Sequence, residues 1–191
     1  MEIKKENLVA AYNTADDSGK KMLQALFPEA QFETPQTADN RPVTERIKTF
    51  ADAAKAVGID DPEGWEDGYS DVEPDILAYF KLRIIVQALN EGWKPQFTTE
   101  EWRYYPWFWL YTEQEIEDMD EDEKNDRRMM NTGDYVTDYA GFAFAYSGSV
   151  PSSSYAAVGS RLCLKTPELA TYCGKQFIGI WADYLLTRKD A

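Results

Sequence analysis

The sequence contains no histidine among its 191 residues. Ser-His and Cys-His nucleophilic catalysis, histidine general bases and the commonest zinc sites all need an imidazole, so none of these is available. Carboxylates, lysines, tyrosines and cysteines remain available for catalysis. The absence of histidine therefore argues against an enzyme without excluding one. No cofactor and no metal site is predicted.

Cysteines and long apolar runs are also scarce. The two cysteines, Cys163 and Cys173, match no metal-binding spacing, and a single disulfide is uncommon in a cytosolic protein, so both are interpreted as small core residues. The longest apolar candidate, 76–89, is interrupted by Lys81 and Arg83 and is shorter than the roughly 20 residues that span a bilayer. The N-terminus has no apolar signal region, and we expect a soluble cytoplasmic protein without membrane contact.

Positive charge is in short supply. The chain has 20 Lys and Arg residues against 34 Asp and Glu residues, with a net charge of −14. Such a chain repels the phosphates of nucleic acids unless its basic residues cluster on one face. Nucleic acid is therefore an unfavourable partner, and a basic protein partner fits the charge better. The sequence gives no oligomeric state.

Aromatic residues, by contrast, are concentrated in one stretch from Ala88 to Tyr111. This stretch holds nine aromatic side chains, including four of the six tryptophans. Each large aromatic side chain buries roughly 150–250 Å² and dominates the core or interface that receives it. We therefore expect this stretch to be the structural centre of the protein. Its last part, 102–111, has the composition of a strand, and Pro106 indicates an edge strand or a bulge.

Helical patterns precede and follow this stretch. Residues 3–91 show helical spacing, with a capping box at Thr49 and Asp52 and a strong helix from Pro74 to about Glu91 that Gly92 ends. The polar segment 31–42 is expected to be a linker, and the acidic segment 59–74 a loop at a boundary. Two or three antiparallel strands are predicted within 135–165, with 155–165 as one of them, followed by a closing helix after Thr166. The fold class is therefore α+β, in one domain over 1–191, with 1–60 as a candidate helical subdomain.

The segment 113–126 contains nine acidic residues and one lysine. Part of it begins like a calcium-binding loop, but Glu123 stands where that loop needs glycine and Met129 where it needs glutamate, so an EF-hand is rejected. Three interpretations remain: a solvated helix face, a docking surface for basic residues, or a loose divalent cation site.

Two blocks of the sequence carry a resemblance to a known family. ALNEGWKPQFTTEEWRYYPWF (88–108) and VGSRLCLKTPELATYCGKQFIGIWADYL (158–185), with weaker similarity at 12–27 and 44–50, resemble a family of uncharacterised proteins from phages and prophages of gut bacteria. The resemblance implies a protein of a mobile element inside a bacterial host cell, or one associated with the virion. It also implies that residues 112–155 form a variable, insertion-like segment. It provides no catalytic residue to transfer.

The candidate binding residues come from two places. Alternation along a strand puts Tyr104, Pro106 and Phe108 on one face and Tyr105, Trp107 and Trp109 on the other. At least one face is expected to be core, and the other is a candidate platform for bases, sugars or a protein segment. Arg161 and Lys165 lie among apolar residues of an acidic chain, and either hold an anion or pair with the protein's own carboxylates. The candidate binding set is therefore Tyr104, Tyr105, Trp107, Trp109, Arg161 and Lys165.

Three functions agree with these features. The first is a non-enzymatic phage or prophage protein that binds a protein partner through an aromatic or variable surface. The second is an acidic DNA mimic that inhibits a host defence or DNA-processing protein. The third is a histidine-free enzyme acting on a glycan or nucleotide, which requires a pocket where two carboxylates, or a tyrosine and Arg161, converge.

Overall fold

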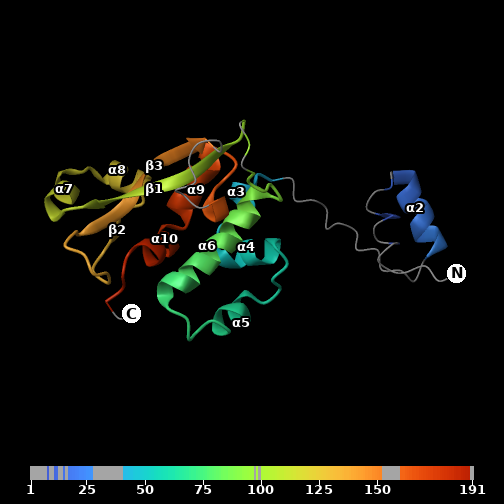
Figure 1. Cartoon of the computed structure of the whole chain (residues 1–191), viewed down its shortest axis with the longest axis horizontal. Helices are drawn as coiled ribbons and strands as arrows, with labels where there is room; N and C mark the ends of the chain where they lie inside the picture. The colour runs from blue at the N-terminus through green and yellow to red at the C-terminus, as the bar shows by residue number, and fades with distance from the viewer. Residues whose placement is uncertain are drawn as a thin grey trace. The chain divides into compact units, whose positions relative to one another are not determined.

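Figure 1 shows a computed structural model of the chain, which describes residues 8, 11–12, 15, 17–27, 41–96, 98, 100–151 and 160–189. The internal contacts divide the chain into two compact units, Met1–Asn40 and Arg41–Ala191. The expected helix at 3–12 and the expected linker at 31–42 lie largely outside the described residues.

In the first unit, helix α2 (Asp17–Leu26) is amphipathic, and it ends two residues before Pro28. The residue before a proline is disfavoured in helical conformation, which accounts for this end. The side-chain amide of Gln24 donates a hydrogen bond of 2.9 Å to the hydroxyl of Tyr12. Met22 and Leu26 are exposed.

The second unit begins with helices α3 (Val43–Arg46), α4 (Phe50–Ala56), α5 (Pro62–Asp67) and α6 (Pro74–Asn90). The capping box predicted at Thr49 is confirmed, because the Thr49 hydroxyl accepts from the Asp52 N–H at 3.1 Å and the Asp52 carboxylate accepts from the Thr49 N–H at 2.8 Å. Helix α6 starts at the predicted proline. It ends where Glu91 and Gly92 take positive φ angles of 48° and 86°.

Residues 59–74 were expected to be a boundary loop, but they contain α5. Asp61 accepts a hydrogen bond of 3.0 Å from the Gly64 N–H, and Pro62 fits the first helical turn. Helix α5 packs on α4 inside the larger unit. The division of the chain lies earlier, between Asn40 and Arg41.

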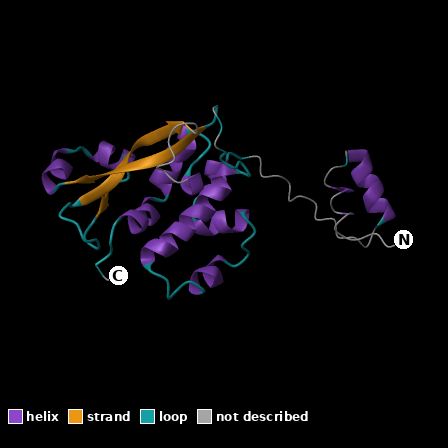
Figure 2. Ribbon diagram, viewed as in Figure 1, coloured by secondary structure: helices purple, strands orange, loops and turns teal. Residues whose placement is uncertain are grey.

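The sheet has three antiparallel strands in the order β1-β3-β2, shown in orange in Figure 2: β1 (Trp102–Tyr111), β3 (Gly141–Pro151) and β2 (Met130–Asn131). Strand β1 is an edge strand, as Pro106 predicted. The register shifts next to this proline, because Trp107 faces Tyr146 while Phe108 faces Phe144, which leaves Ala145 as an extra residue on β3.

The prediction of a strand over 155–165 is wrong for 160–165, the part that the structure describes. Residues Ser160–Leu162 form a short 3-10 helix, η1, and only Leu164 makes a bridge, to Tyr104; 155–159 lie outside the described residues. The partner of the long strand β3 is instead the aromatic strand β1. Strands β3 and β2 both belong to the sheet, so these parts of segment 112–155 are not an insertion outside it. Helices α7 (Glu113–Asp118) and α8 (Glu121–Asp126) lie in the connection between β1 and β2.

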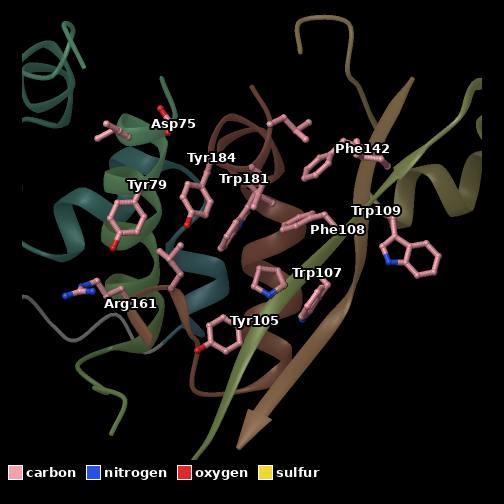
Figure 3. A pocket seen from close by; sticks show the side chains of 16 residues that line it. Asp75, Tyr79, Tyr105, Trp107, Phe108, Trp109, Phe142, Arg161, Trp181 and Tyr184 are labelled. Atoms are coloured by element: carbon pink, nitrogen blue, oxygen red, sulfur yellow. The ribbon is translucent and has the colours of Figure 1, made fainter. Parts of the chain in front are cut away.

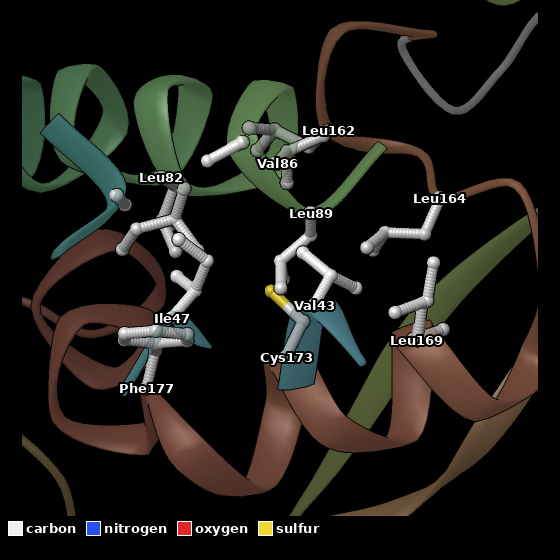
Figure 4. Packing of buried hydrophobic residues seen from close by; sticks show 14 of the residues in the cluster. Val43, Ile47, Leu82, Val86, Leu89, Leu162, Leu164, Leu169, Cys173 and Phe177 are labelled. Atoms are coloured by element: carbon white, nitrogen blue, oxygen red, sulfur yellow. The ribbon is translucent and has the colours of Figure 1, made fainter. Parts of the chain in front are cut away.

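The core lies between the helices and one face of the sheet (Figure 4). Leu82, Ile85 and Leu89 of α6 are fully buried, each stabilising the fold by roughly 1.5–3 kcal/mol through removal of apolar surface from water. They pack with residues of α9 (Pro167–Gln176) and α10 (Ile178–Leu185), including Cys173 and Trp181. Neither Cys163 nor Cys173 forms a disulfide, and both are buried, as predicted.

The architecture is α+β: N-terminal helices, a three-stranded antiparallel sheet, and C-terminal helices that pack on it. In the described part of the chain, no helix combines the length and the apolar character needed to cross a membrane.

Candidate functional site

The two faces of strand β1 differ in burial: one packs on the helices, and the other is partly exposed to solvent. The face that carries Tyr104, Pro106 and Phe108 packs on the helices: Tyr104 and Phe108 adjoin the main core cluster, and an added Cβ at Gly174 of α9 would lie 2.7 Å from Cβ of Pro106. On the other face, Trp107 and Trp109 are 45% and 57% exposed. Within the predicted binding set, these two tryptophans are the aromatic residues that the structure leaves exposed.

Trp107 is fixed by its neighbours on β3. Its ring stacks on that of Tyr146, with 5.9 Å between the centroids and an angle of 6° between the planes. Gly148 lies beneath its indole, since an added Cβ there would be 2.1 Å from Nε1 of Trp107. Tyr146 is itself about half exposed. We call the surface formed by Trp107, Trp109 and Tyr146 the aromatic face.

Tyr105 does not belong to this surface, because its side chain is only 6% exposed. Burial, with the Cys163 thiol beside it, raises the pKa of Tyr105 to about 12. Burial likewise raises the pKa of the Cys163 thiol to about 11, although the nearby Arg103 charge opposes the rise. Both groups are therefore neutral near pH 7, and the cysteine lacks the thiolate that a nucleophile needs.

Lys165 is held by the end of helix α6. Its ammonium group lies 3.1 Å from the carboxylate of Glu91, and its backbone N–H donates to the side-chain oxygen of Asn90 at 3.0 Å. The Lys165 hydrogen bond lowers the pKa of Glu91, burial opposes this, and Arg46 adds to the lowering. Lys165 thus pairs with the protein's own carboxylate. Arg161 is exposed, and its guanidinium makes no ion pair within the described ranges of the chain.

A groove of about 820 Å³ lies between β1 and the helices (Figure 3). Its helical wall is formed by Tyr79 of α6 and by Trp181 and Tyr184 of α10, and its other wall by residues 105–110 of β1. Arg161 and Asp75 contribute its charged groups. Figure 3 shows Arg161 at the level of Tyr105 and Asp75 beyond Tyr184, so the two charges lie toward opposite ends.

The acidic segment forms two short helices, α7 (Glu113–Asp118) and α8 (Glu121–Asp126). They lie near the Trp109 end of the aromatic face. An added Cβ at Gly141, which faces Tyr111 across the sheet, would lie 2.7 Å from Ile116 of α7 and from Met129 just after α8, and the ring centroid of Tyr111 is 6.5 Å from that of Trp109. Three of the nine acids pair with cations of the chain itself, namely Glu121 with Lys124, Glu123 with Arg127, and Asp126 with Lys175. The other six acids make no ion pair within the described residues.

Neither cavity near Arg161 brings two carboxylates together among its described lining residues. The groove contains Asp75, and a second cavity of about 770 Å³, next to the end of α6, contains Glu91. The lowered pKa of Glu91 is the opposite of what a general acid needs near neutral pH. In the part of the chain that the structure describes, there is also no cluster of three metal-ligating side chains.

The sequence did not identify several residues that form the aromatic face and the groove. The alternating run 142–146 indicated a strand, but nothing in it showed that Tyr146 would stack on Trp107 or that Gly148 would lie under the indole. The helical wall of the groove comes from residues that sequence spacing assigns to core stripes, such as Trp181 and Tyr184.

Comparisons with protein families, with curated proteins and with solved structures found no match.

Proposed function

We propose that this chain is a binding protein that engages a basic segment of a protein partner through its aromatic face. The observation that carries the proposal is the parallel stack of Trp107 on Tyr146, two rings that pack on each other and leave about half of their surface in solvent. Trp109 extends this surface along the same side of β1.

The chemistry of the surface indicates the class of partner. Exposed tryptophan and tyrosine side chains are enriched among the residues that dominate the affinity of protein interfaces. Aromatic rings also attract the guanidinium and ammonium groups of arginine and lysine, by roughly 0.5–2 kcal/mol per contact. Helices α7 and α8 lie near the Trp109 end of this surface. Some of their carboxylates, such as those of Glu117 and Asp122, make no ion pair within the described residues. Aromatic rings near carboxylates favour a basic partner, in agreement with the net charge of −14.

The resemblance of the sequence to proteins of phages and prophages supplies the setting of the proposal. In that setting the partner is a protein of the bacterial host cell or of the phage itself. The binding role does not depend on which of the two it is.

The test is affinity capture from a lysate of a gut bacterium, at low and at moderate salt concentration. The parent is compared with Trp107→Ala/Trp109→Ala, with Glu117→Gln/Asp122→Asn, and with the control Tyr139→Ala, whose side chain is exposed to a similar extent as that of Trp107. Circular dichroism verifies that each variant folds. We expect a captured protein that the tryptophan variant loses, that the control retains, and that the carboxylate variant releases at lower salt. Capture that is the same for all folded variants would refute the proposal.

A further inference from the structure

The groove runs along the edge of strand β1. It is lined by six consecutive residues, Tyr105 to Leu110. Consecutive side chains of a strand point to opposite faces, so a cavity over one face would touch only alternate residues. Contact with all six places the groove beside the strand, at the edge that faces away from β3.

The backbone groups of Phe108 and Leu110 point into this edge. Tyr104 exchanges both of its backbone hydrogen bonds with Leu164, at 3.1 and 2.9 Å, on the side away from β3. Every second residue along β1 has the same orientation, because the extra residue of the register shift lies on β3. The hydrogen bond of Phe144 on β3 agrees with this orientation of Phe108. Phe144 faces Phe108 in the register, but its N–H donates to the Arg127 carbonyl and so points away from β1.

Between Pro106 and Leu110 this edge has no strand partner in the described part of the chain. The sheet order makes β1 an edge strand, and the only outer bridge among the described residues is the one at Tyr104. Pro106 lacks an N–H, so at this position the edge offers only a carbonyl. Phe108 and Leu110 each offer a donor and an acceptor. Unpaired edges of this kind are templates for the addition of another strand.

The two sides of the edge differ in chemistry. A segment placed along β1 would direct alternate side chains toward Trp181 and Tyr184, whose rings offer mainly apolar surface, and the others toward Trp107 and Trp109 on the aromatic face. The apolar side suits large aliphatic or aromatic residues. The aromatic side, whose Trp109 end lies near α7 and α8, suits lysine or arginine.

We propose that an extended segment of a partner protein, with alternating apolar and basic residues, adds to β1 as a fourth strand by pairing with Phe108 and Leu110. Arg161, at one end of the groove, binds a carboxylate of that segment. This inference rests on the proposed function, since both require a protein partner. It adds the conformation of the partner segment and the backbone atoms that bind it.

The first test measures amide hydrogen exchange by NMR in the free full-length chain. We expect the N–H groups of Phe108 and Leu110 to exchange at least about tenfold faster than those of Trp107 and Trp109, which are paired with β3. Slow exchange of Phe108 and Leu110 at every protein concentration would mean that the chain itself occupies the edge. Protection that grows with concentration would assign the edge to a second copy. Either result overturns the inference.

The second test selects binders from a displayed library of random linear octapeptides, and then uses synthetic versions of the selected peptides. We expect alternation of apolar and basic residues and protection of the Phe108 and Leu110 N–H groups on binding. N-methylation at every second position of the peptide should weaken binding about tenfold or more, while methylation at the intervening positions should change it less than about threefold. A library that yields no binder, or a binder without this period of two, would contradict the inference.

A matched pair of variants tests the same contact from the side of the protein. Leu110→Pro and Leu110→Ala both lose the side chain, but only the proline loses the N–H. We expect peptide binding to be at least about tenfold weaker for the proline than for the alanine variant. If the proline variant does not fold, the methylation series on the unaltered chain still decides the question.

The two proposals fail in different ways. Capture that depends on Trp107 and Trp109, combined with equal peptide binding by Leu110→Pro and Leu110→Ala, would retain the proposed function and reject strand addition. Peptides that bind with a period of two, combined with capture that is insensitive to the tryptophans, would retain strand addition and reject the aromatic face.

Discussion

The side-chain amide of Asn90 donates a hydrogen bond of 2.9 Å to the backbone carbonyl of Cys163, 73 residues later in the chain. The oxygen of the same amide accepts from the Lys165 N–H at 3.0 Å. Asn90 is 3% exposed. One buried amide thus holds the segment that places Leu164 against the edge of β1, and it sets where the groove begins.

Replacement of this amide should destabilise the fold. Asn90→Ala leaves the Cys163 carbonyl and the Lys165 N–H without their partner in a buried region, and we expect a loss of about 2–3 kcal/mol in the free energy of unfolding. Urea unfolding measures it, with Asn125→Ala, at an exposed position of α8, as the control. A loss no larger than that of the control would show that Asn90 does not hold this segment.

Two glycines should respond in opposite directions to the same substitution. At Gly174 a Cβ would lie 2.7 Å from both Phe144 and Pro106, so Gly174→Ala should cost about 1–3 kcal/mol by forcing α9 away from the sheet. At Gly179 of α10 nothing lies within 4 Å, and Gly179→Ala should stabilise the helix by about 0.5–1 kcal/mol. Thermal unfolding of both variants checks this pair. A neutral result at Gly174 would mean that the helix and the sheet are less closely packed.

The stack of Trp107 on Tyr146 should be measurable as a coupling energy. A double-mutant cycle with Trp107→Ala and Tyr146→Ala is expected to give about 0.5–1.5 kcal/mol. Gly148→Ala should abolish most of this coupling, because its methyl group would displace the indole. Chemical unfolding of the single, double and triple variants provides these values. Additive single-variant effects would show that the two rings do not interact in solution.

The ion pairs of Glu91 should make stability depend on acid pH. The pKa of Glu91 is lowered from its ordinary 4.5 in the folded state, so its pairs with Lys165 and Arg46 stabilise the fold above that pH. Their contribution disappears as the pH falls through the lowered value. Because Glu91 is 43% exposed, Glu91→Gln should cost less than about 1 kcal/mol at pH 7, and the difference from the parent should shrink as the pH falls from 7 to below 4.5 and the carboxylate takes up a proton. Urea unfolding across this range tests the sign, and a gap that widened in acid would contradict it.

The two thiols should be inert in the native protein. Burial raises the pKa of Cys163 to about 11 and that of Cys173 to about 12, which leaves almost no thiolate at pH 8. We expect neither cysteine to react with a disulfide reagent at that pH until denaturant unfolds the chain, when both react. Rapid reaction of one thiol in native buffer would show that its surroundings open.

Local signals in the sequence predicted much of the fold. Thr49 and Asp52 predicted the capping box, and Pro74 and Gly92 predicted the start and end of α6, because such signals act over a few neighbouring residues. Pro106 predicted an edge strand for a similar reason: its missing N–H restricts the positions that it can take in a sheet. The sequence did not predict the short helix α5. Asp61 and Pro62 are a helix-start signal, but the two glycines and the acidic residues of segment 59–74 favoured a loop.

The sequence by itself determined the α+β class, the buried cysteines and the alternation of side chains along β1, all of which follow from local propensity, burial preference and strand geometry. Only the tertiary structure decided which aromatic side chains reach solvent. Tyr105 and Trp107 lie two positions apart on the same face of β1. Tyr105 is nevertheless buried next to Cys163, whereas Trp107 packs on Gly148 and Tyr146 and remains exposed. The tertiary structure also decided the position of the groove, whose helical wall comes from α6 and α10 and whose strand edge is paired only at Tyr104, by Leu164, among the described residues. Contacts between residues so far apart in the chain leave no periodic signal in either segment.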